Sequence, residues 1–343
     1  MSQLYSEILA QPEALQRLLA NGWNSAVHAA ERINEFAPAW VLIAARGASG
    51  NAARYAQYLF GAHNHLCVGF AAPSLISRYR ASPRMSRALV IGISQSGQSP
   101  DVVAVLDEAR RQGSLTLALT NEVASPLASA CSMTVPICAG AELAVAATMT
   151  YTNALLALAM LSVALEGDVE RRATLDQIPR CVQTVIDAVS GPATQAATAV
   201  SNCEKVIVLG RGFNYCTAFE IALKLQELCY LPALAYSPPE LLHGPAAMLD
   251  AESLLVRVVP VGVSEVNPEL DALVAQRGSR TLAISNNAEI LAQTQLRLPD
   301  GPQEWTTPIL AIVAGQLFAH ALCLARGNNP DLPRGLAKVT RTL

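Results

Sequence analysis

A cluster of short polar side chains between residues 94 and 99 has the composition of an anion-binding loop. It follows an apolar run and precedes a helical pattern, which places it between a strand and the start of a helix. Backbone N–H groups and hydroxyls at a helix N-terminus neutralise a phosphate through hydrogen bonds and the helix dipole. The segment has no Walker lysine and no GxGxxG pattern, which favours a single phosphate over a nucleotide. The candidate ligands are Ser94, Gln95, Ser96, Gly97 and Ser99.

A simpler interpretation is that these serines only cap a helix. Ser99 precedes Pro100, which is typical of an N-cap followed by the first helical residue. Capping does not, however, require the polar residues at 94–96. Ser49, in RGASGN (46–51), allows the same two interpretations. It caps a helix, or it faces the same ligand, because ligands of open parallel sheets bind beyond the carboxyl ends of the strands.

A second constellation consists of Glu220, Lys224 and Glu227, which are spaced i, i+4 and i+7 and so share one helical face. In an average helix such a stripe faces solvent. Here the flanking positions are strongly apolar, so the stripe faces either solvent or a polar cleft. A carboxylate beside a lysine in a cleft suits proton transfer at carbon.

Two isolated residues carry weaker signals. His243 precedes a Gly-Pro turn and is either structural or catalytic. Lys338 lies in a C-terminal tail, where a lysine either aids solubility or closes over a substrate and forms an imine with its carbonyl. The histidines, including those of HNH (63–65), lack metal-ligand spacing, and we expect no metal and no redox cofactor.

The elements that must position these residues alternate between strand and helix. Short apolar strands are predicted at 40–47, 65–70, 87–94, 114–120 and 132–137, with helices at 49–60, 99–111 and 146–166. The pattern restarts with strands at 205–212, 253–262 and 279–285 and helices at 213–229 and 306–325. Such alternation indicates parallel sheets with helices on both faces.

The two starts resemble each other, VLIAARGASGNAARYA against VIVLGRGFNYCTAFEIA, which indicates an internal duplication. We therefore predict two α/β halves at 36–166 and 201–326, joined by a helical linker at 167–200. Helices at 1–35 precede them and a tail at 327–343 follows, without a helix through the first half of the tail.

Composition excludes several classes of function. The net charge of −3 argues against a nucleic-acid partner. No apolar run reaches the roughly 18 uninterrupted residues of a membrane span. The N-terminus has no basic-then-apolar signal, and the eight scattered cysteines indicate no disulfides, so we expect a cytoplasmic protein.

Four motifs, in order, resemble the sugar isomerase (SIS) family, especially the isomerase half of glucosamine-6-phosphate synthase and its stand-alone relatives. They are the SQSG loop, the GRG…E…ALKLxE helix, the ELxHGP stretch and the PRxLAK tail. The resemblance implies two tandem flavodoxin-like αβα domains. It also implies a hexose 6-phosphate substrate and a homodimer with shared active sites.

The resemblance assigns a role to each candidate residue. Glu227 would move the proton between C1 and C2, with Lys224 and Glu220 lining the site. His243 would open the sugar ring from the partner subunit, and Lys338 would form the imine. The implied phosphate and sugar ligands are Ser49, Ser94, Gln95, Ser96, Gly97, Ser99 and Thr148.

Three segments of this sequence differ from the family motifs, and these differences leave the identity of the substrate undecided. SQSGQS replaces SQSGET, RGAS replaces CGTS, and AATMTYT (146–152) stands where ASTKAFT is expected, with Thr148 retained. The chain also begins about 40 residues before its first strand, so we expect no glutaminase domain. We therefore expect deamination of glucosamine 6-phosphate to fructose 6-phosphate and ammonia. Aldose–ketose isomerisation, fructosamine 6-phosphate deglycation and non-catalytic sensing are the alternatives.

Overall fold

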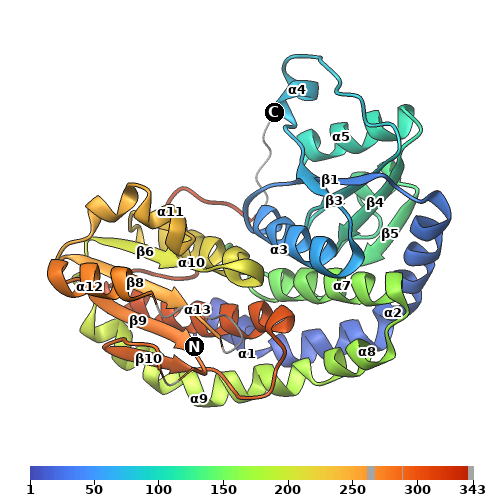
Figure 1. Cartoon of the computed structure of the whole chain (residues 1–343). Helices are drawn as coiled ribbons and strands as arrows, with labels where there is room; N and C mark the ends of the chain where they lie inside the picture. Colours follow the sequence, from blue (N-terminus) through green and yellow to red (C-terminus); the bar gives the residue numbers. More distant parts are fainter. Residues whose placement is uncertain (261–266, 288, 339–343) are drawn as a thin grey trace. The chain divides into compact units, whose positions relative to one another are not determined.

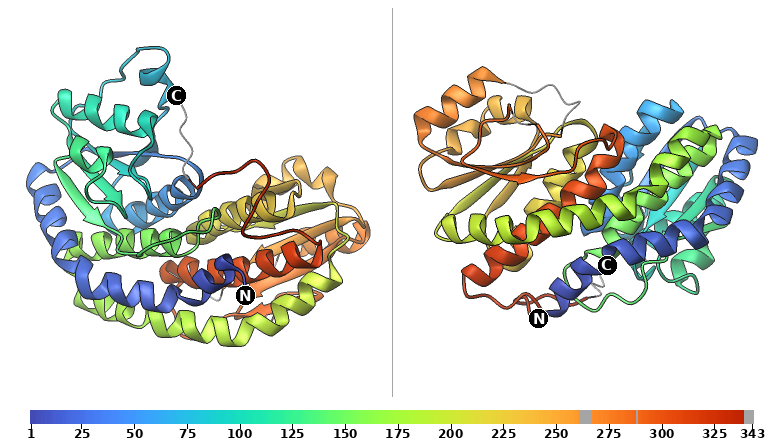
Figure 2. Two further views of the ribbon diagram at one scale, coloured as in Figure 1. Left: turned by 180° about the vertical axis from the view of Figure 1, so that it is seen from behind. Right: turned by 90° about the horizontal axis from the view of Figure 1, so that it is seen from below.

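The protein is described by a computed structural model that covers residues 1–260, 267–287 and 289–338. The chain divides into two compact units (Figures 1 and 2). One unit comprises residues 13–142, 149–177 and 337–343, and we call it the loop unit. The other comprises residues 1–12, 143–148 and 178–336, and we call it the helix unit. Each contains one five-stranded parallel sheet, and each is described by itself.

The loop unit is built on a sheet with strand order β2-β1-β3-β4-β5. Its strands are β1 (Trp40–Ala45), β2 (Val68–Phe70), β3 (Ala88–Ile93), β4 (Leu115–Thr120) and β5 (Met133–Pro136). The central strand β3 and its neighbour β4 are buried at every position, as in a sheet covered on both faces. α3 (Gly47–Asn64) packs with α7 (Met149–Glu166) on one face. α5 (Pro100–Arg111) and α6 (Pro126–Ala130) pack with the short α4 (Ser74–Ser77) on the other.

The helix unit repeats this plan with strand order β10-β9-β8-β6-β7. Its strands are β6 (Lys205–Leu209), β7 (Ala233–Tyr236), β8 (Ser253–Val258), β9 (Arg280–Ser285) and β10 (Thr294–Arg297). α10 (Tyr215–Cys229) packs with α13 (Thr307–Ala325), and α11 (Pro238–Leu242) and α12 (Pro268–Arg277) cover the opposite face. α9 (Ile178–Ala199) runs beside α13, as both figures show. α1 (Gln3–Leu9) also contacts α13.

The predicted duplication is confirmed in the backbone itself. Numbered from its own first strand, each sheet has the order 2-1-3-4-5 of flavodoxin-like folds. The first strand of each sheet ends at an Arg-Gly pair, and Arg46 (φ −136°, ψ 159°) and Arg211 (φ −136°, ψ 158°) have nearly the same conformation. The helices that follow both end in a left-handed residue, His65 and Tyr230, each with φ 55°.

The remaining helices connect and extend the two sheets. α2 (Gln11–Phe36) leads into β1, and α8 (Val169–Asp176) follows α7. Both regions were predicted to be helical. The tail has no helix between residues 328 and 338, as predicted, and its last five residues lie outside the described chain.

Several sequence predictions need correction. The strands at 233–236 and 294–297 and the helices at 238–242 and 268–277 were missed. They are four to ten residues long, too short for a distinctive periodicity. The strand predicted at 253–262 ends at Val258, and positions 261–262 lie outside the described residues.

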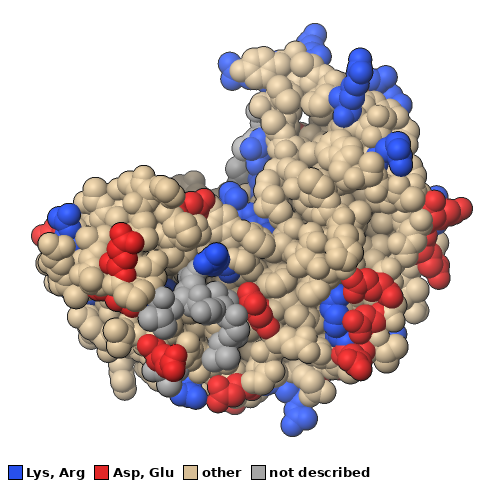
Figure 3. All heavy atoms as spheres, in the orientation of Figure 1, with Lys and Arg blue, Asp and Glu red and all other residues tan. Residues whose placement is uncertain are grey.

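The prediction about membrane spans concerned uninterrupted apolar runs, and average composition is a less strict criterion. By length and apolar composition alone, α7 and residues 304–325 could cross a bilayer. However, 83% and 89% of the residues in these two windows are buried inside the protein, as in core helices. Consistent with 15% charged residues, most of the surface in Figure 3 is neither acidic nor basic.

Candidate active site

The predicted phosphate loop leaves the carboxyl end of β3 and leads directly into α5. Its backbone is held by neighbouring segments: the N–H of Asn121 donates to the Gln95 carbonyl at 3.2 Å, and the N–H of Leu127 donates to the Gly97 carbonyl at 3.0 Å. Two hydroxyls bond within the loop, since Ser94 Oγ accepts from Gly97 N–H and Ser96 Oγ accepts from Gln98 N–H. The loop therefore has one defined conformation at a helix N-terminus, the position at which anions bind.

Gly97 is required in this loop for two separate reasons. Its φ of +61° lies in the left-handed region that side chains disfavour. A Cβ at this position would also lie 2.1 Å from Ser125 Oγ and 2.4 Å from Ser125 Cβ. Ser125 is the N-cap of α6, so it is not free to move away without loss of its own capping bond.

The predicted N-cap position is confirmed for Ser99 and is wrong for Ser49. Ser99 is the N-cap residue of α5, but its hydroxyl makes no capping hydrogen bond. Ser49 is not a cap at all, because α3 begins at Gly47 and its N-cap is Arg46. Neither hydroxyl is therefore explained by helix capping. Both side chains are partly exposed at the carboxyl edge of the first sheet.

The charged stripe of α10 is buried rather than solvated. Glu220 is fully buried and Lys224 is 1% exposed, whereas the Glu227 side chain is 22% exposed. The Lys224 ammonium lies 3.2 Å from Glu220 Oε1 and 2.6 Å from Glu227 Oε2. Burial of a charged group costs roughly several kcal/mol per ion. A protein in which hydrophobic residues of similar volume replace a buried ion pair is often just as stable. The triad is therefore better explained by function than by stability.

The local electrostatics keep Lys224 charged. Burial by itself would lower the pKa of its amine, but the carboxylates of Glu220 and Glu227 outweigh that effect and raise it above its usual value. The Lys224 ammonium thus holds one oxygen of Glu227. The exposed part of the triad is a carboxylate with a fixed orientation, which is what a base for proton transfer at carbon requires.

α10 starts where it does because of a close turn. Gly210 directly follows β6, and a Cβ there would lie 2.2 Å from the Asn214 carbonyl oxygen. Only glycine permits that approach.

In the same unit, His243 is the exposed C-cap residue of α11, and Thr148 is buried directly before α7.

The tail lysine has a partner that sequence reasoning missed. Lys338 Nζ lies 2.5 Å from Oε2 of Glu142, whose side chain is fully buried. Glu142 also accepts hydrogen bonds from the backbone N–H and hydroxyl of Thr150, in the first turn of α7. The carboxylate therefore caps α7 and anchors the tail at once. Since 196 positions separate Glu142 from Lys338, no local pattern could have indicated the pair.

The predicted residues thus form two groups. The loop unit holds Ser49, the loop at 94–99 and Lys338, and the helix unit holds Thr148, the α10 triad and His243. Within the described residues, no three histidine, cysteine or acidic side chains gather as a metal site would require.

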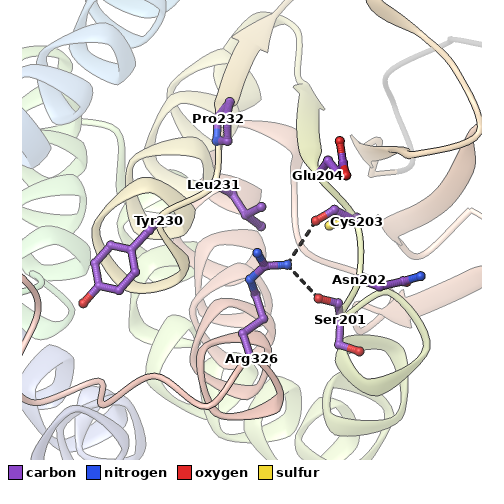
Figure 4. Close-up of a pocket in the computed structure, with 8 residues that line it drawn as sticks. All are labelled: Ser201, Asn202, Cys203, Glu204, Tyr230, Leu231, Pro232 and Arg326. Atoms are coloured by element: carbon purple, nitrogen blue, oxygen red, sulfur yellow. Dashed lines mark hydrogen bonds between the residues drawn. The ribbon is translucent and has the colours of Figure 1, made fainter.

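Two pockets lie away from these residues, at the amino ends of the strands. One, of about 530 Å³, is lined by Tyr230, Leu231 and residues 201–204 (Figure 4). There the Arg326 guanidinium donates to the carbonyls of Ser201 and Cys203. The other, of about 330 Å³, occupies the equivalent place in the first sheet, beside residues 63–66. None of the predicted site residues lines either pocket.

The chain is an α/β protein with two parallel sheets of the same strand order, a polar loop at one strand end and a buried acid–lysine triad. The family model for the SIS domain matches residues 40–164 and 199–325, and the chain belongs to this family.

Among curated proteins, the chain is 30% identical to glutamine–fructose-6-phosphate aminotransferase [isomerizing] of Pyrococcus horikoshii, over 98% of this chain and 57% of that protein. It spans about half the length of the curated relatives it matches.

Two solved structures cover almost the whole chain. A Silicibacter pomeroyi protein, assigned provisionally as a phosphosugar isomerase, matches with a TM-score of 0.87 and 32% identity, over 96% of this chain and 100% of that one. The C-terminal domain of glucosamine-fructose-6-phosphate aminotransferase from Francisella tularensis matches with a TM-score of 0.88 and 26% identity, over 96% and 98%. The predicted family and fold are confirmed.

Proposed function

We propose that this protein is a phosphosugar isomerase that acts as an aminosugar-phosphate deaminase, converting glucosamine 6-phosphate to fructose 6-phosphate and ammonia. The observation that carries the proposal is the buried triad of α10, in which the partly exposed Glu227 carboxylate lies 2.6 Å from the Lys224 ammonium. Membership of the SIS family and 30% identity to an isomerising aminotransferase support it.

The loop at 94–99 would hold the phosphate. Its hydroxyl at Ser99 is not used for capping, and its backbone is fixed at the N-terminus of α5. A helix N-terminus and hydroxyls that can still donate a hydrogen bond bind a phosphate through charge-assisted hydrogen bonds. Ser49, Gln95 and Thr148 would contact the rest of the sugar.

The chemistry would follow from one proton transfer. After His243 assists ring opening, Glu227 takes the C2 proton of the open-chain aldehyde, and an enolamine forms. Protonation at C1 gives an imine at C2, and water hydrolyses that imine to the ketose and ammonia. In the reverse direction, Lys338 would bind the ketose carbonyl as an imine, with loss of water. These steps need neither a metal nor a redox cofactor.

The test is an assay over a panel of substrates. Purified protein is incubated with 2-amino-2-deoxyhexose 6-phosphates, plain aldose and ketose 6-phosphates, and a fructosamine 6-phosphate, and both ammonia and sugar products are measured. Release of ammonia with formation of fructose 6-phosphate supports deamination. Ketose formation without ammonia would instead establish a plain isomerase, and amine release from the fructosamine a deglycase. Binding without turnover of any sugar would establish a sensor.

Glu227→Gln serves as the active-site variant in this assay, with Glu252→Gln as its matched control. Glu252 is exposed and lies in the same unit, at the turn before β8. The first change should reduce turnover by roughly 10²–10⁴-fold, the typical contribution of a general base. The second should leave turnover unchanged.

The proposal extends to a homodimer in which His243 of one subunit serves the site of the other. Mixing Glu227→Gln chains with His243→Asn chains tests this directly. If His243 acts across the interface, each mixed dimer has one intact site, and random mixing restores about a quarter of the full activity. If His243 acts within its own subunit, every site stays defective and no activity returns. None of the eight cysteines, all of which lie in the described residues, forms a disulfide, which suits a reducing compartment such as the cytoplasm.

A further inference from the structure

An arginine that has no role in the proposed mechanism lies at the same sheet edge as the phosphate loop. Arg46 is the first residue after β1, and Ser94 is the first residue after β3. The two strands are parallel neighbours, and their last residues, Ala45 and Ile93, are register partners. The backbones of Arg46 and Ser94 therefore leave the sheet side by side, at its carboxyl edge.

The Arg46 side chain is held toward the start of α5. Its Nε and Nη2 both lie 2.8 Å from Oδ2 of Asp101, the second residue of that helix and only two positions after Ser99. The Asp101 side chain is 1% exposed, whereas the Arg46 side chain is 54% exposed. A buried carboxylate thus anchors an accessible guanidinium beside the helix end that follows the phosphate loop.

The remaining donors of this guanidinium suit a phosphate. A guanidinium has five N–H donors in one plane, and a single carboxylate oxygen cannot use them all. Arginine forms bidentate hydrogen bonds with phosphate, and its charge adds to the helix dipole. The Arg46 backbone is the N-cap of α3, but a guanidinium has no acceptor and so cannot cap a helix N-terminus. Helix capping therefore does not account for this arginine.

We propose that Arg46 is a direct ligand of the substrate phosphate, positioned by Asp101, and that it gives the site its selectivity for phosphorylated over neutral sugars. This inference rests on the proposed function, because it assumes that the loop at 94–99 binds a phosphate. Asp101 acts through Arg46 and is a positioning residue.

The alternative role for Arg46 is only to neutralise Asp101, whose charge would otherwise repel a phosphate. A double-variant cycle separates the two roles. Binding of fructose 6-phosphate and of inorganic phosphate is measured by titration calorimetry for the wild type, Arg46→Ala, Asp101→Asn and the double variant. Arg111→Ala is the matched control, since Arg111 lies on the same helix in an exposed ion pair with Glu108.

If Arg46 is a ligand, Arg46→Ala weakens binding of both probes by roughly ten- to a hundredfold, the usual range for a charge-assisted hydrogen bond. The double variant then stays weak, and Arg111→Ala binds like the wild type. If the double variant regains wild-type binding, Arg46 only neutralises Asp101 and the inference is wrong. Arg46→Ala alone leaves the buried Asp101 carboxylate without a partner and could unfold the protein. The double variant has no such carboxylate, so its binding can be measured even in that case.

Failure of the proposed function would look different. If the wild type binds neither probe, the loop is not a phosphate site and the proposed function fails with it. If the wild type binds and Ser96→Ala weakens binding while Arg46→Ala does not, the phosphate site stands and only the role of Arg46 is refuted.

Discussion

Lys338 Nζ lies 2.5 Å from Oε2 of Glu142, a carboxylate that also caps the first turn of α7 through Thr150. The pair attaches Lys338 to the core of the loop unit, to which both residues belong. In this arrangement the Lys338 amine, which we propose forms the imine, is held in an ion pair. A substrate carbonyl must therefore compete with Glu142 for this amine.

Loss of the carboxylate charge should loosen the tail. In Glu142→Gln, the amide oxygen can still accept from Thr150, but the ammonium loses its counter-charge. We expect trypsin to cleave after Lys338 several-fold faster than in the wild type, as measured by limited proteolysis with mass spectrometry. Thr150→Val is the control, because it removes one bond to Glu142 and leaves the ion pair. Equal cleavage rates in Glu142→Gln and the wild type would show that this ion pair does not hold the tail.

Removal of the buried cation in α10 should destabilise the protein strongly. Lys224→Met leaves the carboxylates of Glu220 and Glu227 together without a counter-charge, and breaking a buried ion pair in this way costs about 3–5 kcal/mol. Urea denaturation measures the loss. Lys224→Met with Glu220→Gln removes one of the two charges and should recover part of it. A loss below about 1 kcal/mol for the single change, which is typical of exposed pairs, would contradict the buried triad.

A matched pair of glycines separates steric exclusion from backbone strain in the phosphate loop. Gly97 and Gly113 both have a positive φ, but a Cβ would collide with Ser125 only at Gly97. Gly113→Ala should cost about 1 kcal/mol, the usual strain of a left-handed residue. Gly97→Ala should cost more and should also abolish binding of fructose 6-phosphate. Thermal melting and calorimetry measure the two effects, and similar losses for both variants would exclude the steric explanation.

Acidification should weaken the docking of α1. His320 Nε2 lies 2.9 Å from Ser2 Oγ, and its ring stacks on Tyr5. Burial lowers the pKa of His320, although the nearby Asp331 acts in the opposite direction. Since the folded state favours the neutral ring, this stability is present above the unfolded value of about 6.5 and is lost as the pH falls below it.

The melting temperature should therefore decrease between pH 7.5 and pH 5.5. In His320→Gln, which cannot take up a proton, this decrease should be smaller. An equal decrease in both proteins would assign the effect to other groups.

Much of the fold could be predicted because it depends on local patterns. The apolar runs before the two Arg-Gly pairs predicted β1 and β6, and their similar sequences predicted two sheets with the same strand order. The predicted ends of the strands differ from the observed ends by a few residues, because hydrogen bonds to the neighbouring strands decide where a strand ends. The short strands β7 and β10 carried no periodicity of their own, and they exist because a neighbouring strand offers them a partner.

The sequence by itself determined the family, the duplicated α/β plan and the identity of the candidate residues, since motif order and periodicity survive in a linear string. Only the tertiary structure decided what those residues touch. It buried Lys224 between two carboxylates and paired Glu142 with Lys338 and Arg46 with Asp101. It also left the hydroxyl of the N-cap residue Ser99 without a capping hydrogen bond. Spacing along one helix predicts which side chains share a face of that helix. Whether that face is buried, and which distant residues it pairs with, depends on how the elements pack.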